Sequence, residues 1–219
     1  MRIDWVPYSA SALVAGATAL SVGALLLPTG QETSETLAIA QEKNGQWLAV
    51  SLLFFLASVA LTVGVPAILT LFDGRGSRLG LIAVSMFTVG AIGTAGYAML
   101  LAFVRALVLE GEIGGHSLDD VTQDTGLAIF LFGWIAFFVL GELLLAIALL
   151  VARSTPRWIP LLLIAHVATV ALGSFLPEDL ESLSALLLTI ALSGIGINAA
   201  TQREARMGKW VGALPPLTH

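Results

Sequence analysis

The chain contains no cysteine and little charge. Without cysteine, disulfide bridges, thiolate metal sites and cysteine nucleophiles are all excluded. Asp, Glu, Lys and Arg make up only 11% of the 219 residues, whereas an average soluble domain carries about 25%. A soluble surface of this size needs more charge than the sequence supplies, so we predict a protein whose main partner is the lipid bilayer.

Long apolar runs take the place of the missing charge. Hydrophobic residues make up 57% of the chain and the mean hydropathy is +0.93. The runs are continuous and do not alternate with period two, which argues against a β-barrel. Because about 20 apolar residues of helix cross a bilayer, we predict an all-α polytopic membrane protein, with residues 1–219 forming a single transmembrane domain of six spans. The spans cover residues 6–27, 47–72, 79–104, 126–152, 159–176 and 183–200.

Basic and acidic residues separate into different connections. Eight of the ten Lys and Arg residues lie in the N-terminal head, in the connections after the second and fourth spans, and in the C-terminal tail; the other connections hold eleven of the fifteen Asp and Glu residues. Cytoplasmic connections carry the excess of Lys and Arg. We therefore predict a multi-pass protein of the cell membrane with both termini cytoplasmic, and an even number of spans agrees with both termini on one side. The eight basic residues are Arg2, Arg75, Arg78, Arg153, Arg157, Arg203, Arg206 and Lys209.

Small residues recur at helical spacing in two of the predicted spans. Such residues let helix backbones approach closely within a membrane. We predict helix packing at both places, either inside the protein or against a membrane partner or a second copy of the chain. The residues are Ser11, Ala15, Ala19 and Gly23 in the first span, and Gly90, Gly93 and Gly96 in the third.

One carboxylate lies in the middle of the fourth span. Glu142 is the only ionisable residue between Gly126 and Ala152, and at this depth it must be protonated, paired or facing a polar cavity. The only ionisable residue of the fifth span is His166. A short connection makes the two spans antiparallel neighbours. At 1.5 Å per residue their depths differ by about one helical turn, so the side chains can meet if both face inward.

Weakly polar faces on the fifth and sixth spans accompany these two groups. Thr169 follows His166 at helical spacing, and Ser193 shares a face of the sixth span with Thr189 and Gly196. We predict a polar cavity among the fourth, fifth and sixth spans. The alternative is structural, with a protonated carboxyl group making one interhelical hydrogen bond and the histidine serving as a packing residue. The ligand-binding or proton-accepting candidates are Glu142, His166, Thr169 and Ser193.

Sequence motifs of enzymes and cofactor sites are missing. There is no nucleophile elbow, no His-Glu-x-x-His helix, no phosphate loop and no dinucleotide fingerprint. A haem held by two intramembrane histidines is not available, because His166 is the only one: His116 lies in an acidic connection and His219 ends the chain. The sequence favours a non-enzymatic protein without cofactor or metal, and nothing in it indicates nucleic-acid binding.

Two resemblances involve the first part of the chain. Pro28 ends the first apolar run, Asn44-Gly-Gln-Trp47 precedes the second, and Arg75-Gly-Ser-Arg78-Leu-Gly80 follows it. This arrangement resembles a group of uncharacterised six-span membrane proteins of actinobacteria, which implies no particular activity. Six spans in 219 residues, with small residues along the first, also resemble the substrate-binding component of vitamin transporters. That resemblance implies packing of the first span against a partner subunit.

Two functions are compatible with these observations. The first is binding or transport of a small molecule or ion through a polar cavity near the middle of the last three spans. The second is an accessory or structural role, in which small-residue helix faces dock a larger membrane partner.

Overall fold

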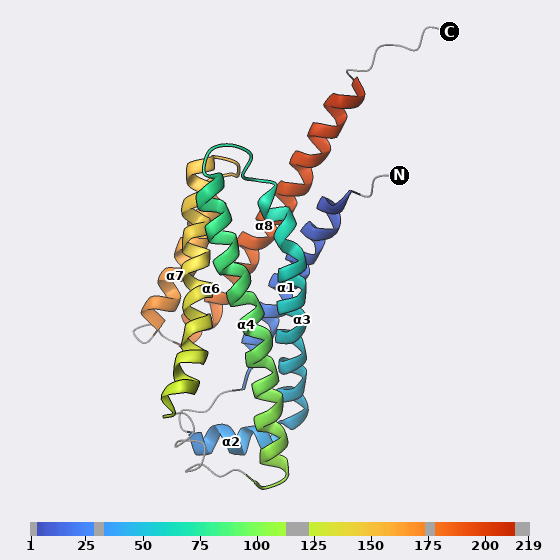
Figure 1. The fold of residues 1–219 in the computed structure, drawn as a ribbon. Helices are drawn as coiled ribbons and strands as arrows, with labels where there is room; N and C mark the ends of the chain where they lie inside the picture. The colour runs from blue at the N-terminus through green and yellow to red at the C-terminus, as the bar shows by residue number, and fades with distance from the viewer. Residues whose placement is uncertain (1–3, 29–32, 113–122, 174–177, 213–219) are drawn as a thin grey trace, which may run out of the picture.

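Seven α-helices make up the part of the chain that the computed structural model describes, namely residues 4–28, 33–112, 123–173 and 178–212. No strand occurs in these ranges, so the predicted all-α class is confirmed. Figure 1 shows the helices along the chain. They are α1 (Trp5–Leu26), α2 (Thr33–Glu42), α3 (Asn44–Leu69), α4 (Ser77–Leu109), α6 (Thr125–Ala152), α7 (Trp158–Leu172) and α8 (Glu178–Gly212).

Five segments are long and apolar enough to cross a membrane: α1, α3, α4, α6 and the Ser184–Ala205 part of α8. The apolar helix α7 has only 15 residues. It covers about 22 Å at 1.5 Å per residue, less than the hydrocarbon core of about 30 Å. The fifth predicted span, residues 159–176, is therefore helical but short over its described part, and its last three residues lie outside the described ranges.

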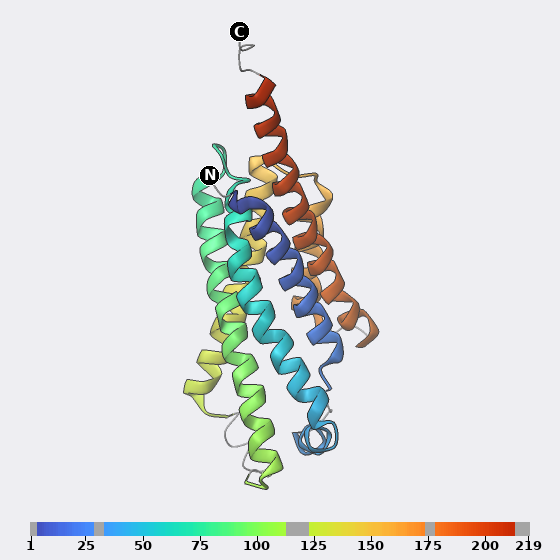
Figure 2. The same cartoon turned by 90° about the vertical axis from the view of Figure 1, so that its right-hand side faces the viewer.

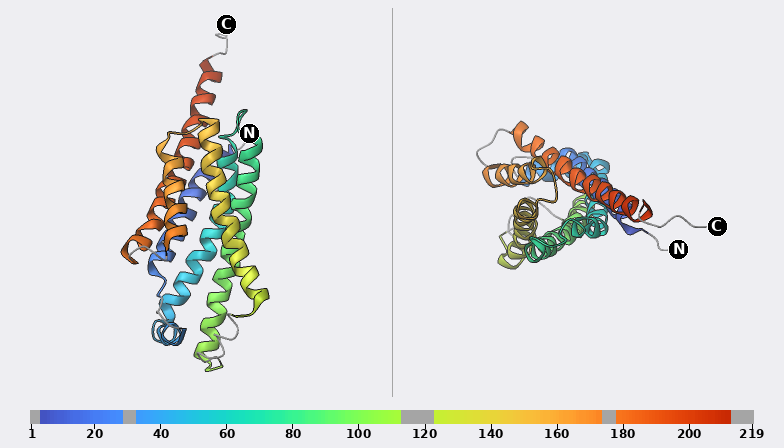
Figure 3. Two further views of the ribbon diagram at one scale, coloured as in Figure 1. Left: turned by 90° about the vertical axis from the view of Figure 1, so that its left-hand side faces the viewer. Right: turned by 90° about the horizontal axis from the view of Figure 1, so that it is seen from above.

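The long helices run up and down one bundle. Helix α3 packs between α1 and α4, α6 packs on α4, and α8 packs on α1 and α7. The start of α1 and the last turns of α8 lie at the same end of the bundle, whereas α2 lies across the opposite end (Figures 1 and 2). Helix α7 ends, and α8 begins, well short of the level of α2 (Figure 3). At the α2 end, α3 and α4 therefore extend further than α7 and α8 do.

Polar bonds tie the helices together at the α2 end. Leu37 of α2 is buried, and this helix packs on α3 and α4. The Trp47 indole N–H donates to the Leu101 carbonyl at 2.9 Å. Arg105 donates from Nε to the Asn44 carbonyl at 2.8 Å and from Nη2 to the Asn44 Oδ1 at 3.1 Å. In lipid the hydrophobic effect does not drive helices together, so hydrogen bonds such as these contribute directly to helix association.

The proline within α3 is accommodated by α1. Pro66 has no N–H, and its ring disturbs the backbone bonds of the preceding turn. The Ser9 hydroxyl of α1 donates to the Val63 carbonyl and accepts from the Ala67 N–H, both at 2.9 Å. One buried hydroxyl therefore satisfies two backbone groups beside the proline.

Two of the three glycines singled out in the third span lie against α6. A Cβ at Gly90 would lie 2.4 Å from the Cα of Phe138, and one at Gly93 would lie 2.4 Å from the Cβ of Trp134. A side chain at Gly90 would therefore displace the α6 backbone. A Cβ at Gly96 would meet no atom within 4 Å, so Gly96 lies outside the α4–α6 contact.

The small-residue stripe of the first span is not the main contact surface of α1 within the chain. Helix α1 packs on α3 through a neighbouring face, where a Cβ at Gly16 would lie 2.7 Å from the backbone N of Leu61. One residue along a helix is a rotation of about 100°, which carries most of the stripe away from this face. Ser11 and Ala15 are exposed, Ala19 is half-buried and Gly23 is buried.

Leucine at Gly90 and leucine at Gly96 should have different effects on stability. We expect Gly90→Leu to lower the free energy of unfolding by about 1–3 kcal/mol or more, the usual cost of overpacking. Gly96→Leu adds the same side chain to the same helix in open space, so it serves as the matched control. Thermal unfolding followed by circular dichroism in detergent micelles compares the two variants, and equal losses would contradict a specific α4–α6 contact at Gly90.

Candidate functional site

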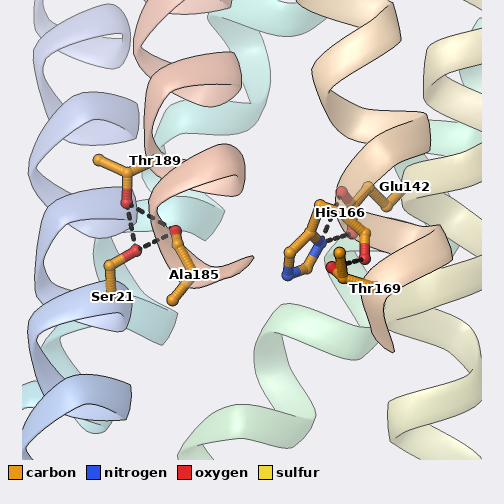
Figure 4. Close-up of polar contacts among 6 residues, drawn as sticks. All are labelled: Ser21, Glu142, His166, Thr169, Ala185 and Thr189. Carbon is orange, nitrogen blue, oxygen red and sulfur yellow. Dashed lines mark hydrogen bonds and ion pairs between the residues drawn. The ribbon is translucent and has the colours of Figure 1, made fainter. Parts of the chain in front are cut away.

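Glu142 and His166 meet between α6 and α7. The Nδ1 atom of His166 lies 2.9 Å from both Oε1 and Oε2 of Glu142 (Figure 4). Glu142 is wholly buried and His166 is 8% exposed. The antiparallel order and spacing of the two helices therefore bring these two candidates to the same depth and into direct contact.

The residue before Glu142 helps to position it. A Cβ at Gly141 would lie 2.4 Å from the backbone N of Phe87, so α6 touches α4 there. The next residue is rotated by about 100°, which turns Glu142 from α4 toward α7. Leu145 and Leu163, one turn from Glu142 and His166 respectively, are also wholly buried. The pair therefore lies in an apolar interior.

The proton of the Glu142–His166 hydrogen bond can lie on either partner. If Nδ1 carries the proton, it donates to the carboxylate; if the carboxyl group carries it, the O–H donates to Nδ1. Neither α6 nor α7 contains another ionisable side chain. Since an isolated buried charge is costly, the interior favours the forms in which the charges of Glu142 and His166 balance each other or are both absent.

Thr169 lies one turn from His166 but bonds within its own helix. Its hydroxyl donates to the His166 carbonyl at 2.7 Å. Back-bonding of this kind satisfies a hydroxyl inside a membrane helix without any neighbouring helix. Thr169 therefore flanks the pair, and its hydroxyl proton is donated to the backbone and not to Glu142 or to the His166 ring.

The polar face of the sixth predicted span turns toward α1 and away from the pair. The Thr189 hydroxyl donates to the carbonyls of Ala17 and Ala185, at 3.2 Å each. Ser21 of α1 donates to the Ala185 carbonyl at 2.6 Å and also hydrogen-bonds the Thr189 hydroxyl. Figure 4 shows this cluster apart from Glu142 and His166. Ser21 was not singled out in the sequence, where it is one hydroxyl among several in the first span.

Ser193 is not brought to the pair. A Cβ at its neighbour Gly194 would lie 2.5 Å from the ring of Trp158. Trp158 begins α7, eight residues before His166, which is about 12 Å along the helix axis. Of the four candidates, the described structure thus joins only Glu142 and His166. Thr189 and Gly196, which share the predicted face with Ser193, contact α1 instead, so a role for Ser193 stays a prediction.

Two of the pockets lie among described residues, and neither of these two includes Glu142 or His166. A groove of about 370 Å³ lies between α4 and α6 and is lined by apolar side chains such as Phe103 and Phe130. A second pocket of about 230 Å³ lies near the end of α3 and includes Asp73 and Arg203. The Glu142–His166 pair does not form the wall of either of these pockets.

The described residues contain no group of three or more His, Cys, Asp or Glu side chains arranged to hold a metal ion. His116 and His219 lie outside these residues. Comparisons with protein-family models, curated proteins and solved structures find no match. The resemblances to actinobacterial six-span proteins and to vitamin-transporter components therefore stay predictions, and the function has to be argued from the geometry of the pair.

A double-mutant cycle measures how strongly the pair is coupled. We expect Glu142→Leu and His166→Phe each to lower the free energy of unfolding by about 1–3 kcal/mol, because each leaves a buried polar group without its partner. The double variant should cost less than the sum, with a coupling energy of about 0.5–3 kcal/mol. Denaturant unfolding in mixed micelles provides the four values. Strictly additive costs would mean that the two side chains do not stabilise each other.

Proposed function

We propose that this chain is an integral membrane protein that binds or transports a small molecule or ion, with the Glu142–His166 pair as its centre. The supporting observation is that a wholly buried carboxylate contacts the only ionisable side chain of the neighbouring helix. Ionisable groups at such depth are costly, and paired ones mark ion and substrate pathways in membrane proteins. A binding or transport role needs no further reactive group, whereas catalysis would.

We further propose that the chain crosses the cell membrane six times with both termini cytoplasmic. The start of α1 and the last turns of α8 lie at the same end of the bundle (Figure 1), which fits an even number of crossings. The basic connections that contain Arg75 and Arg153 belong to that end as well, and the positive-inside rule makes it cytoplasmic. This topology counts α7 as a crossing, its short length being matched by local thinning of the bilayer.

Cysteine labelling tests this topology, because the chain has no cysteine of its own. Ser77→Cys and Gln123→Cys introduce single thiols at exposed positions at opposite ends of the bundle, since α4 and α6 begin there. We expect a membrane-impermeant maleimide to label Gln123→Cys on intact cells, and Ser77→Cys only after permeabilisation. Labelling of Ser77→Cys from outside would reverse the proposed orientation.

A ligand screen tests the role of the pair. The purified protein is heated with a panel of small molecules and ions, and a ligand at about 100 times its Kd should stabilise it by about 2.7 kcal/mol. We expect Glu142→Gln and His166→Gln to abolish this stabilisation. Thr88→Val should retain it, because the Thr88 hydroxyl bonds its own helix at the Val84 carbonyl and does not contact the pair. Ligands that stabilise all variants equally would make the pair structural.

A second candidate function is an accessory subunit, which the exposure of Ser11 and Ala15 on α1 supports. Small exposed residues at helical spacing allow another membrane helix to approach closely. In that case the protein should co-purify with a stoichiometric membrane partner, or as a homo-oligomer, and Ala15→Leu should remove that association. A solitary protein that binds a ligand favours the first candidate.

A further inference from the structure

The Glu142–His166 contact uses one edge of the imidazole ring. Nδ1 lies 2.9 Å from each carboxyl oxygen, and Figure 4 shows Nε2 on the opposite side of the ring, directed away from Glu142. The carboxyl group is wholly buried, whereas His166 retains a small exposed fraction. Nε2 is therefore the atom through which the pair can exchange a proton with its surroundings.

The number of protons on the pair sets its net charge. With two protons the pair is neutral: an imidazolium faces a carboxylate, or a neutral imidazole accepts from a carboxyl group, and Nε2 carries a hydrogen in both cases. These two forms differ only in the position of the shared proton between Nδ1 and the carboxyl oxygens. With one proton, Nδ1–H donates to the carboxylate, Nε2 is bare, and the net charge is −1.

Among the described side chains of the packed helices, no charged group compensates a net charge at this depth. Among described side chains, α6 and α7 carry only the pair itself. The ionisable side chains of α4 and of the Ser184–Ala205 part of α8 lie near the helix ends, with one exception. The exception is the phenol of Tyr97, whose ring contacts Phe54 and Trp134. The neutral, doubly protonated pair is thus favoured in an apolar interior. The end groups are Arg78, Arg105, Arg203 and Glu204.

We infer that the Glu142–His166 pair stores one exchangeable proton, which enters and leaves at Nε2 of His166. The inference rests on the proposed function and deepens it, because it names the proton as the ion that this site binds. On release, the Nε2–H bond breaks, its electron pair stays on the nitrogen, and the proton passes to a water molecule. The shared proton then remains on Nδ1 and donates to the carboxylate, which carries the single negative charge. Uptake reverses these steps.

Glu142 has a defined part in this exchange. In the form that has lost the proton, the carboxylate accepts from Nδ1–H and fixes the tautomer, so that the bare nitrogen is always Nε2. In the loaded form the same carboxyl group shares the second proton and keeps the pair neutral. A lone histidine at this position could lose its proton from either nitrogen. The pair therefore directs a single proton to a single atom.

Nuclear magnetic resonance of the full-length protein in liposomes, with ¹⁵N-labelled histidine, tests the inference. The chain has three histidines, and His166→Gln identifies the signals of His166. We expect Nε2 to carry a hydrogen at neutral pH and to exchange it for deuterium in heavy water. Thr88→Val should leave all these signals unchanged.

Two results would overturn the inference: an Nε2 that is bare at neutral pH, or an Nε2 hydrogen that does not exchange with heavy water. The proposed function fails differently. If the proton exchanges as expected but stabilisation by ligands or ions does not depend on Glu142 and His166, the exchangeable proton is supported and the binding or transport role is contradicted. If ligand stabilisation depends on both residues while Nε2 is bare, the role stands and the proton store falls.

Discussion

Close approach of helix backbones is the constraint on which this bundle depends. Lipid chains are as apolar as the helix surfaces, so burial of apolar area does not by itself drive helices together in a membrane. Glycine removes the side chain that would keep backbones apart, as Gly16 does toward α3 and Gly90 and Gly141 do between α4 and α6. Van der Waals contact at these points fixes the rotation of each helix. The rotation of α6 at Gly141 in turn directs the next residue, Glu142, to α7.

Buried polar bonds add a second level of specification, and each joins a different pair of helices. Ser9 joins α1 to α3 beside the proline, Trp47 joins α3 to α4, Ser21 joins α1 to α8, and His166 joins α7 to α6. Each bond satisfies groups that lipid cannot satisfy. Three of these bonds pair a side chain with a backbone carbonyl. Only the contact of His166 joins two ionisable groups, and it is the one whose charge can change.

The sequence predicted the depth of side chains better than their direction. Glu142 and His166 meet because the rise per residue and a short connection determine their heights. The number of residues from the connection to each of them can be counted along the chain. Ser193 lies away from them, and Ser11 and Ala15 face outward, because the rotation of α8 and α1 depends on contacts with other helices. A periodic stripe identifies a face but not the helix that it meets. Gly96 has the same spacing as Gly90, yet the helices separate before they reach it.

Because α7 is short, His166 lies much closer to the end of its helix than Glu142 lies to the start of α6. Along α6, Glu142 lies 17 residues from the start of its helix at Thr125, whereas along α7 His166 lies only six residues from the end at Leu172. That is about 26 Å on one helix and about 9 Å on the other. In the six-span topology proposed above, a bilayer that thins to match α7 brings headgroups and water closer to His166 along that helix. In that topology the imidazole is the partner nearer to a membrane surface along its own helix, and the carboxyl group is the one further from it.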